Sequence, residues 1–107
     1  DDVRAFAQDP MALVLAQEAV ALGADQELPV TRRRFVYMPH MHSESLLIHA
    51  EAVTLFSHPG LEANLDFEHR HKAIIERFGR YPHRNAVLGR VSTAAETEFL
   101  LQPGSAF

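Results

Sequence analysis

The stretch HRHKAIIERFGRYPHRNAVLGR, residues 69–90, decides how the chain is organised. Its first ten residues have the apolar spacing of an amphipathic helix, which is expected to end at Gly79. A turn at residues 80–83 follows, and the apolar run 85–88 predicts a short helical piece. Six of the ten Lys and Arg residues of the chain lie in this stretch beside a single acid, Glu76. The sequence therefore places a helix end, a rigid turn and a group of guanidinium side chains together.

Outward from this stretch, the apolar spacing predicts helices over residues 10–22, 31–38, 44–57, 61–78, 85–88 and 94–101. Helix starts are expected at Asp9 with Pro10, at Ser43, and at a Thr93 capping box, and Pro39 is expected to interrupt the second helix. No β-branched alternating run of useful length is present. We therefore predict an all-α fold of antiparallel helices joined by short loops.

The apolar residues also predict which faces are buried. The helix at 10–22 is apolar around too much of its circumference for one stripe, so burial on two sides is expected. In the next helix Phe35, Val36 and Met38 are expected to point inward. Helices 10–22 and 44–57 together carry more apolar residues than a monomer of this length can bury, which predicts self-association into a homo-oligomer.

Length and composition narrow the function classes. A chain of 107 residues, nearly half of them hydrophobic, is enough for one compact domain, so residues 1–107 are expected to form a single all-α domain. The absence of Cys is compatible with a reducing compartment, and a cytoplasmic location is expected. No apolar run approaches the ~20 residues that span a bilayer, so no membrane association is expected. The net charge of −4 argues against general affinity for nucleic acid.

The seven His residues of the chain raise the question of a metal site. His40 and His42 lie near Glu44, and Glu68 precedes His71 at the spacing that some metal proteins use. However, two His residues one apart on a helix point in different directions, and the Glu-x-x-His motif occurs once where a di-iron bundle needs it twice. We therefore predict no metal site and no cofactor.

The turn in the central stretch is the best candidate for a ligand site. Arg77, Arg80, His83, Arg84 and Asn85 surround it, and Arg forks can hold a carboxylate or phosphate. The alternative is structural, because Arg and Asn side chains in such turns often satisfy buried carbonyls at helix ends. That structural role is the stronger alternative from the sequence, and no catalytic residue can be assigned.

Several segments resemble a bacterial family known as domain of unknown function 924. These are RAFAQDPMALVLAQEA at 4–19, YMPHMHSE at 37–44, the central stretch 69–90, and FLLQPGSAF at 99–107. The resemblance implies a tetratricopeptide-like α-α superhelix and, because the family is uncharacterised, no chemistry. Members of the family usually carry a further N-terminal portion that this chain is expected to lack. They also usually carry an Asp-Gln-Glu-Arg-like segment where this chain has Ile48, His49, Ala50 and Glu51.

These observations favour a helical binding or interaction module of uncharacterised function, since stacked helix pairs expose surfaces that suit partners. Its partner would be a protein or a small anionic ligand. The alternative is a small enzyme or sensor that acts on an anionic metabolite at the turn from Arg80 to Asn85. A closed pocket with convergent polar groups would favour this alternative, whereas an open groove or apolar patch would favour the interaction module.

Overall fold

A computed structural model describes residues 6–107, and every regular element in that range is helical, which confirms the all-α prediction. In chain order the elements are α1 (Asp9–Ala21), η2 (Ala24–Glu27), α2 (Val30–Met41), α3 (Leu46–Phe56), α4 (Glu62–Phe78), η3 (Pro82–Arg84), α5 (Asn85–Leu88) and α6 (Ala94–Leu100).

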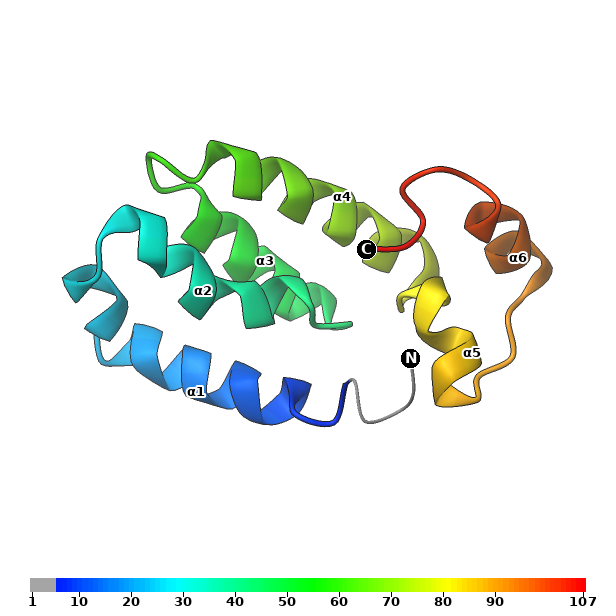
Figure 1. Ribbon diagram of the computed structural model, residues 1–107, viewed down its shortest axis with the longest axis horizontal. Helices are drawn as coiled ribbons and strands as arrows, with labels where there is room; N and C mark the ends of the chain where they lie inside the picture. Colours follow the sequence, from blue (N-terminus) through cyan, green and yellow to red (C-terminus); the bar gives the residue numbers. More distant parts are fainter. Residues whose placement is uncertain (1–5) are drawn as a thin grey trace.

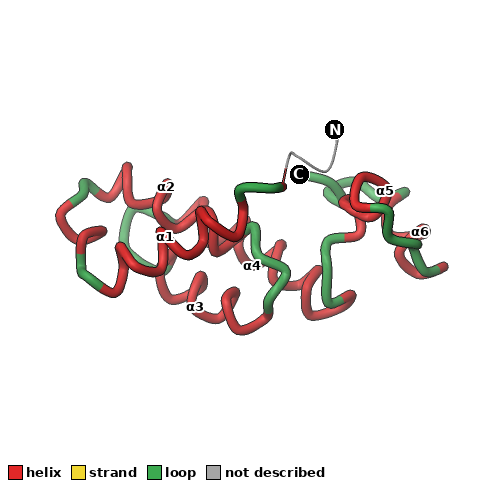
Figure 2. Tube along the Cα trace, turned by 90° about the horizontal axis from the view of Figure 1, so that it is seen from below, coloured by secondary structure: helices red, strands yellow, loops and turns green. Residues whose placement is uncertain are grey.

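Helices α1 to α4 form a row in which each helix packs against the next and runs in the opposite direction (Figure 1). The turn after α4 leads into η3, α5 and α6, which lie together at one end of the row (Figures 1 and 2). This arrangement gives an elongated molecule of 45 × 26 × 22 Å. The C-terminal segment returns from α6 toward the second half of α4 (Figure 1), so Phe107 lies beside His71, with 3.8 Å between their ring centroids.

Several helix boundaries have the local causes that the sequence predicted. Pro10 lies in the first turn of α1, where its missing N–H costs no hydrogen bond. Gly79 ends α4 with φ of 72°, a left-handed conformation that favours glycine, and its N–H donates to the carbonyl of Ile75. The Thr93 capping box is present at the start of α6, with both of its reciprocal hydrogen bonds to Glu96.

Two predicted boundaries were wrong. Helix α2 continues through Pro39 and ends two residues later at Met41, so the one hydrogen bond that the proline cannot donate is lost in the last turn. The cap of α3 is Ser45 rather than Ser43: the Ser45 hydroxyl accepts from the N–H of Ile48, and Ser43 accepts from the N–H of Ser45. The chain between them stays outside the helix because Glu44 is held by distant residues of the central stretch.

The prediction of which faces are buried also needs correction. Helix α1 has a single buried residue, Ala16, whereas Met11, Val14 and Leu15 are all more than half exposed. Because α1 is the first helix of the row and packs mainly against α2, its outer face has no covering helix within the described residues. Phe35 is 66% exposed and does not point inward, and Tyr37 takes the core position instead.

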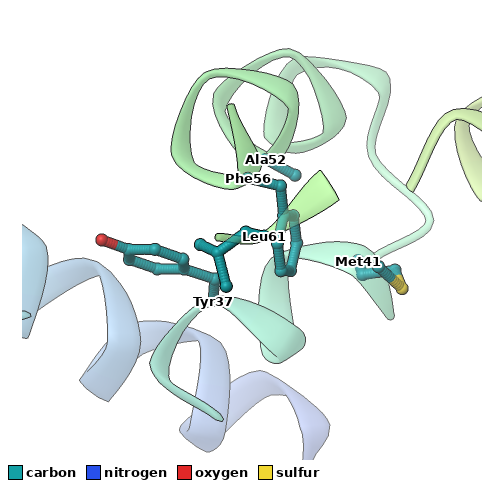
Figure 3. Packing of buried hydrophobic residues seen from close by; sticks show 5 residues of the cluster. All are labelled: Tyr37, Met41, Ala52, Phe56 and Leu61. Atoms are coloured by element: carbon teal, nitrogen blue, oxygen red, sulfur yellow. The ribbon is translucent and has the colours of Figure 1, made fainter. Parts of the chain in front are cut away.

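The core consists of two hydrophobic clusters. The larger lies between α2, α3 and the start of α4 and contains Tyr37, Met41, Ala52, Phe56 and Leu61 (Figure 3). The smaller joins the end of α4 to the turn and α6 through Ile74, Ile75, Tyr81, Phe78 and Phe99. The turn of the central stretch is therefore built into the core by Tyr81, which is fully buried.

Within residues 6–107, none of the helices combines the length and the apolar character that crossing a membrane would require.

Candidate functional site

An ion pair between Arg80 and Glu96 holds one side of the turn. Arg80 follows the left-handed residue Gly79 and donates to both oxygens of Glu96, with Nε at 2.9 Å and Nη2 at 2.7 Å. It also donates to the carbonyl of Val91. The Arg80 hydrogen bonds, together with the N–H of Thr93, lower the pKa of the Glu96 carboxyl to about 2. Arg80 thus joins the end of α4 to the start of α6.

A second ion pair holds the turn from the α2–α3 loop. Arg90 donates from Nη1 and Nη2 to the two oxygens of Glu44, at 2.9 and 3.0 Å, and the N–H of Tyr81 donates to the same carboxylate at 2.6 Å. Asn85 accepts from Nε of Arg90 and donates to Ser92. Although burial opposes ionisation of Glu44, these hydrogen bonds outweigh it and lower the pKa. Arg90 and Glu44 therefore hold the turn in place.

A buried network lies behind the turn. Both carboxylate oxygens of Glu68 lie within 3.0 Å of Nδ1 of His49, while Nε2 of His49 is 2.6 Å from the carbonyl of Ser43. The Tyr81 hydroxyl donates to the carbonyl of Met41 and lies 2.8 Å from the same Nε2. Nε2 of His49 donates to the carbonyl of Ser43, because a carbonyl only accepts. Glu68 is thus the partner of His49 on α3, not of His71 one turn further along α4.

A cleft lies on the opposite side of Tyr81. It has a volume of about 460 Å³ and is bordered by α2, α4, η3 and both ends of the described chain. We call it the Arg84 cleft. Its polar lining is Asp9, His42, Asn64, His71, His83 and Arg84, and its apolar lining is Phe6, Met38, Met41, Phe67 and Phe107. A few polar groups in a mostly apolar concavity of this size are typical of small-molecule sites.

Arg84 is the cation of this cleft. Its guanidinium lies over the rings of Phe6 and Tyr81, with Cζ 4.6 and 4.8 Å from their centroids. Nη2 of Arg84 donates to the carbonyl of His42 at 3.0 Å, and Oδ2 of Asp9 lies 3.8 Å from the same nitrogen. The Arg84 residue is 8% exposed, and its Nε has no hydrogen-bond partner among the described residues. The donor capacity of this buried guanidinium is therefore only partly used, in contrast to Arg80 and Arg90.

The three histidines of the Arg84 cleft are kept neutral by their surroundings. Burial lowers the pKa of His42, His71 and His83, and that of His71 falls to about 4. Nδ1 of His71 lies 2.7 Å from the carbonyl of Phe67 and must donate to it, because a carbonyl only accepts. Nε2 of His71 is consequently an acceptor. Nδ1 of His83 is buried and has no partner in the described part of the chain.

The five residues predicted around the turn separate into different environments. His83 and Arg84 line the Arg84 cleft. Arg80 is bonded to Glu96, Asn85 is bonded to Arg90, and Arg77 lies over the rings of Phe78 and Phe99.

The cleft also contains polar residues that the sequence did not associate with the turn. Asp9, His42 and His71 come from three other parts of the chain. The sequence indicates His42 and His71 only as candidate metal ligands. No cluster of three His, Asp or Glu side chains in residues 6–107 is arranged to hold a metal ion.

Comparisons with known proteins identify relatives without assigning a chemistry. Residues 1–104 match the family described as "Bacterial protein of unknown function (DUF924)". The chain is also similar to a solved structure of a protein of unknown function, ATU0120, from Agrobacterium tumefaciens, with 36% sequence identity and a TM-score of 0.89. The similarity covers 94% of this chain but 56% of the Agrobacterium chain, so this chain spans little more than half the length of that relative. No curated protein matches. Because the family match extends over nearly the whole sequence, the chain belongs to the DUF924 family of bacterial proteins of unknown function.

Proposed function

We propose that this protein is a helical binding module that holds a small organic anion in the Arg84 cleft. The observation that carries the proposal is the state of Arg84: a buried guanidinium, only partly paired by residues 6–107, set in a mostly apolar concavity. A carboxylate would accept from the guanidinium and supply the acceptors that these residues do not provide. The apolar lining would bury the hydrocarbon part of the same ligand.

The charges around the cleft favour an anion of low charge over a highly charged one. The three imidazoles are neutral near pH 7, so they add no positive charge that could balance further negative charge on a ligand. Among the lining residues, Arg84 supplies the guanidinium and Asp9 supplies the carboxylate. A ligand with a single carboxylate therefore fits better than a polyphosphate, which would need several cations.

A matched pair of compounds tests this proposal. The aromatic acid 3-phenylpropanoate should raise the melting temperature of the protein, whereas its neutral isostere 3-phenylpropanamide should have much less effect. Arg84→Gln should remove the response to the acid, and Arg70→Gln, which alters an exposed arginine on α4, should retain it. Isothermal titration would then give the affinities directly.

A second cleft variant covers the case in which Arg84→Gln does not fold. Asn64 lines the cleft, is half-buried and makes no side-chain hydrogen bond within the described residues. Asn64→Trp should therefore fill the cleft without breaking an internal contact, and it should abolish binding of 3-phenylpropanoate. Binding that survives in Asn64→Trp, or equal binding of acid and amide to the unaltered protein, would exclude the cleft as an anion site.

The outer face of α1 favours a second candidate function, which is protein interaction. Met11, Val14, Leu15 and Leu22 are exposed by 57% to 76% and recur at helical spacing along one side of α1. We propose that a second copy of the chain covers this stripe, because a contiguous apolar helix face is unfavourable in water. Light scattering should show a dimer that Leu15→Glu dissociates, whereas Arg70→Gln, at an exposed position of α4, should leave it intact. A monomer at all concentrations would rule this out.

A further inference from the structure

The Arg84 cleft contains two opposite charges side by side. Oδ2 of Asp9 lies 3.8 Å from Nη2 of Arg84, which is longer than a hydrogen bond. The two groups attract each other, yet within the described part of the chain each keeps most of its hydrogen-bonding capacity. The side chain of Asp9 is 38% exposed and that of Arg84 is 9% exposed, so the pair lies at the boundary between the cleft and solvent.

This arrangement would bind a simple carboxylate at some cost. Arg84 would be shared by two carboxylates, that of Asp9 and that of the ligand, and the local net charge would become negative. Desolvating an uncompensated charge is unfavourable in a partly buried site. A ligand that brings a positive group for Asp9 together with a carboxylate for Arg84 would leave every charge paired.

A neutral acceptor lines the same cleft. Nε2 of His71 can accept a hydrogen bond, because Nδ1 of the same ring donates to the carbonyl of Phe67. The His71 ring centroid is 5.8 Å from that of Tyr81, and Cζ of Arg84 is 4.8 Å from the same ring. Both groups therefore lie against one aromatic side chain, and both line the Arg84 cleft. An ammonium group has three N–H donors, so it can bind a carboxylate and an imidazole together.

We propose that the ligand of the Arg84 cleft is an α-amino acid with an apolar side chain. Arg84 binds its carboxylate, Asp9 and the acceptor nitrogen of His71 bind its ammonium group, and Phe6, Phe67 and Phe107 surround its side chain. The proposal rests on the proposed function, because it requires the cleft to hold an organic anion, and it specifies the chemical class of that anion. A volume of about 460 Å³ is sufficient for an amino acid as large as phenylalanine.

Three compounds that share a phenyl ring and an ethyl chain test the assignment. L-Phenylalanine has both charged groups, 3-phenylpropanoate lacks the ammonium, and 2-phenylethylamine lacks the carboxylate. Isothermal titration should show that phenylalanine binds about tenfold more tightly than 3-phenylpropanoate, as expected for an added charge-assisted hydrogen bond. The amine should bind more weakly than either compound, since Arg84 would then face a cation.

A variant of the proposed ammonium ligand separates this inference from the proposed function. Asp9→Asn should reduce the affinity for phenylalanine to about that for 3-phenylpropanoate, while 3-phenylpropanoate binds at least as tightly as before. Glu18→Gln, which removes an exposed carboxylate from the same helix, should keep the preference for phenylalanine. Circular dichroism would verify that both variants remain helical.

The outcomes are distinguishable. If 3-phenylpropanoate binds and phenylalanine binds no more tightly, the amino-acid assignment is wrong and the anion site stands. A preference for phenylalanine that survives in Asp9→Asn also overturns the assignment. If neither acid binds, or if the amine binds as tightly as phenylalanine, the anion site and the amino-acid assignment fail together.

Discussion

On one side of the turn after α4, Arg80 and Arg90 each hold both oxygens of a single carboxylate, whereas on the other side Arg84 retains a buried nitrogen that has no acceptor among residues 6–107. The carboxylates of the first side, Glu96 and Glu44, also accept backbone N–H groups. That side therefore acts as a scaffold. Arg84 meets mainly aromatic rings and one backbone carbonyl, so its charge remains available to a ligand.

The comparison shows that a cluster of arginines in the sequence need not form one site. The predicted set around the turn is divided by Tyr81, whose backbone is held by the scaffold and whose ring faces His71, His83 and Phe107. Carboxylates brought in from the loop before α3 and from α6 decide which arginines are neutralised. Of the two arginines of the set that no carboxylate holds by a hydrogen bond, Arg77 is exposed and Arg84 is buried, so Arg84 marks the side where chemistry with a ligand is possible.

The largest effect should come from the network behind Tyr81. Glu68→Ala should lower the free energy of unfolding by about 3–5 kcal/mol, because it leaves His49 buried without its carboxylate partner. Urea denaturation would measure the loss. Glu76→Ala, at an exposed site of the same helix, is the control and should change stability by less than about 0.5 kcal/mol. A small loss in Glu68→Ala would show that the network does not support the turn.

Removing the carboxylate that holds Arg90 should have the next largest effect. Glu44→Ala breaks a bidentate ion pair and leaves the N–H of Tyr81 without its acceptor, so we expect a loss of about 2–3 kcal/mol. The side chains of Glu44 and Arg90 are each about one-quarter exposed, so the expected loss is smaller than for the fully buried pair of Glu68 and His49. If Glu44→Ala unfolds no more easily than the unaltered protein, the scaffold side depends on other contacts.

Acid should weaken the scaffold through Glu96. Its carboxyl has a pKa of about 2 in the folded protein against an ordinary value of 4.5, so the folded state binds this proton less readily than the unfolded chain. The stabilisation is fully present above pH 4.5 and is lost as the pH falls toward about 2. The free energy of unfolding of Glu96→Gln should therefore fall less steeply between these two pH values than that of the unaltered protein, as measured by urea denaturation at each pH. Identical slopes for the two proteins would contradict this role of Glu96.

The smallest effect is expected on the cleft side. Arg84→Gln removes one hydrogen bond to a carbonyl and a distant attraction to Asp9, so stability should fall by about 1 kcal/mol. The loss should be clearly smaller than that in Glu44→Ala, measured in the same urea series. An equal loss would place Arg84 in the scaffold and remove the difference between the two sides.

The sequence by itself determined the helices, because their causes are local. The apolar spacing of residues 61–78, the left-handed end at Gly79 and the Thr93 capping box each act within a few residues. Errors arose where a distant contact outweighed a local preference. Glu44 is kept out of α3 by Arg90 and Tyr81, and the exposure of α1 depends on which helix covers it. Residues close in sequence determine neither the position of Glu44 outside α3 nor the exposure of α1.

Tertiary structure alone decided which charged groups meet. Asp9 and Arg84 are 75 positions apart in the numbering, and His71 comes from a third element, yet all three line one cleft. Glu68 could pair with His71 one turn away on its own helix, but packing of α3 against α4 places it against His49. Ion pairs form over a few ångströms and are therefore fixed by the packing of helices, whereas the helices themselves follow from the periodicity of the chain.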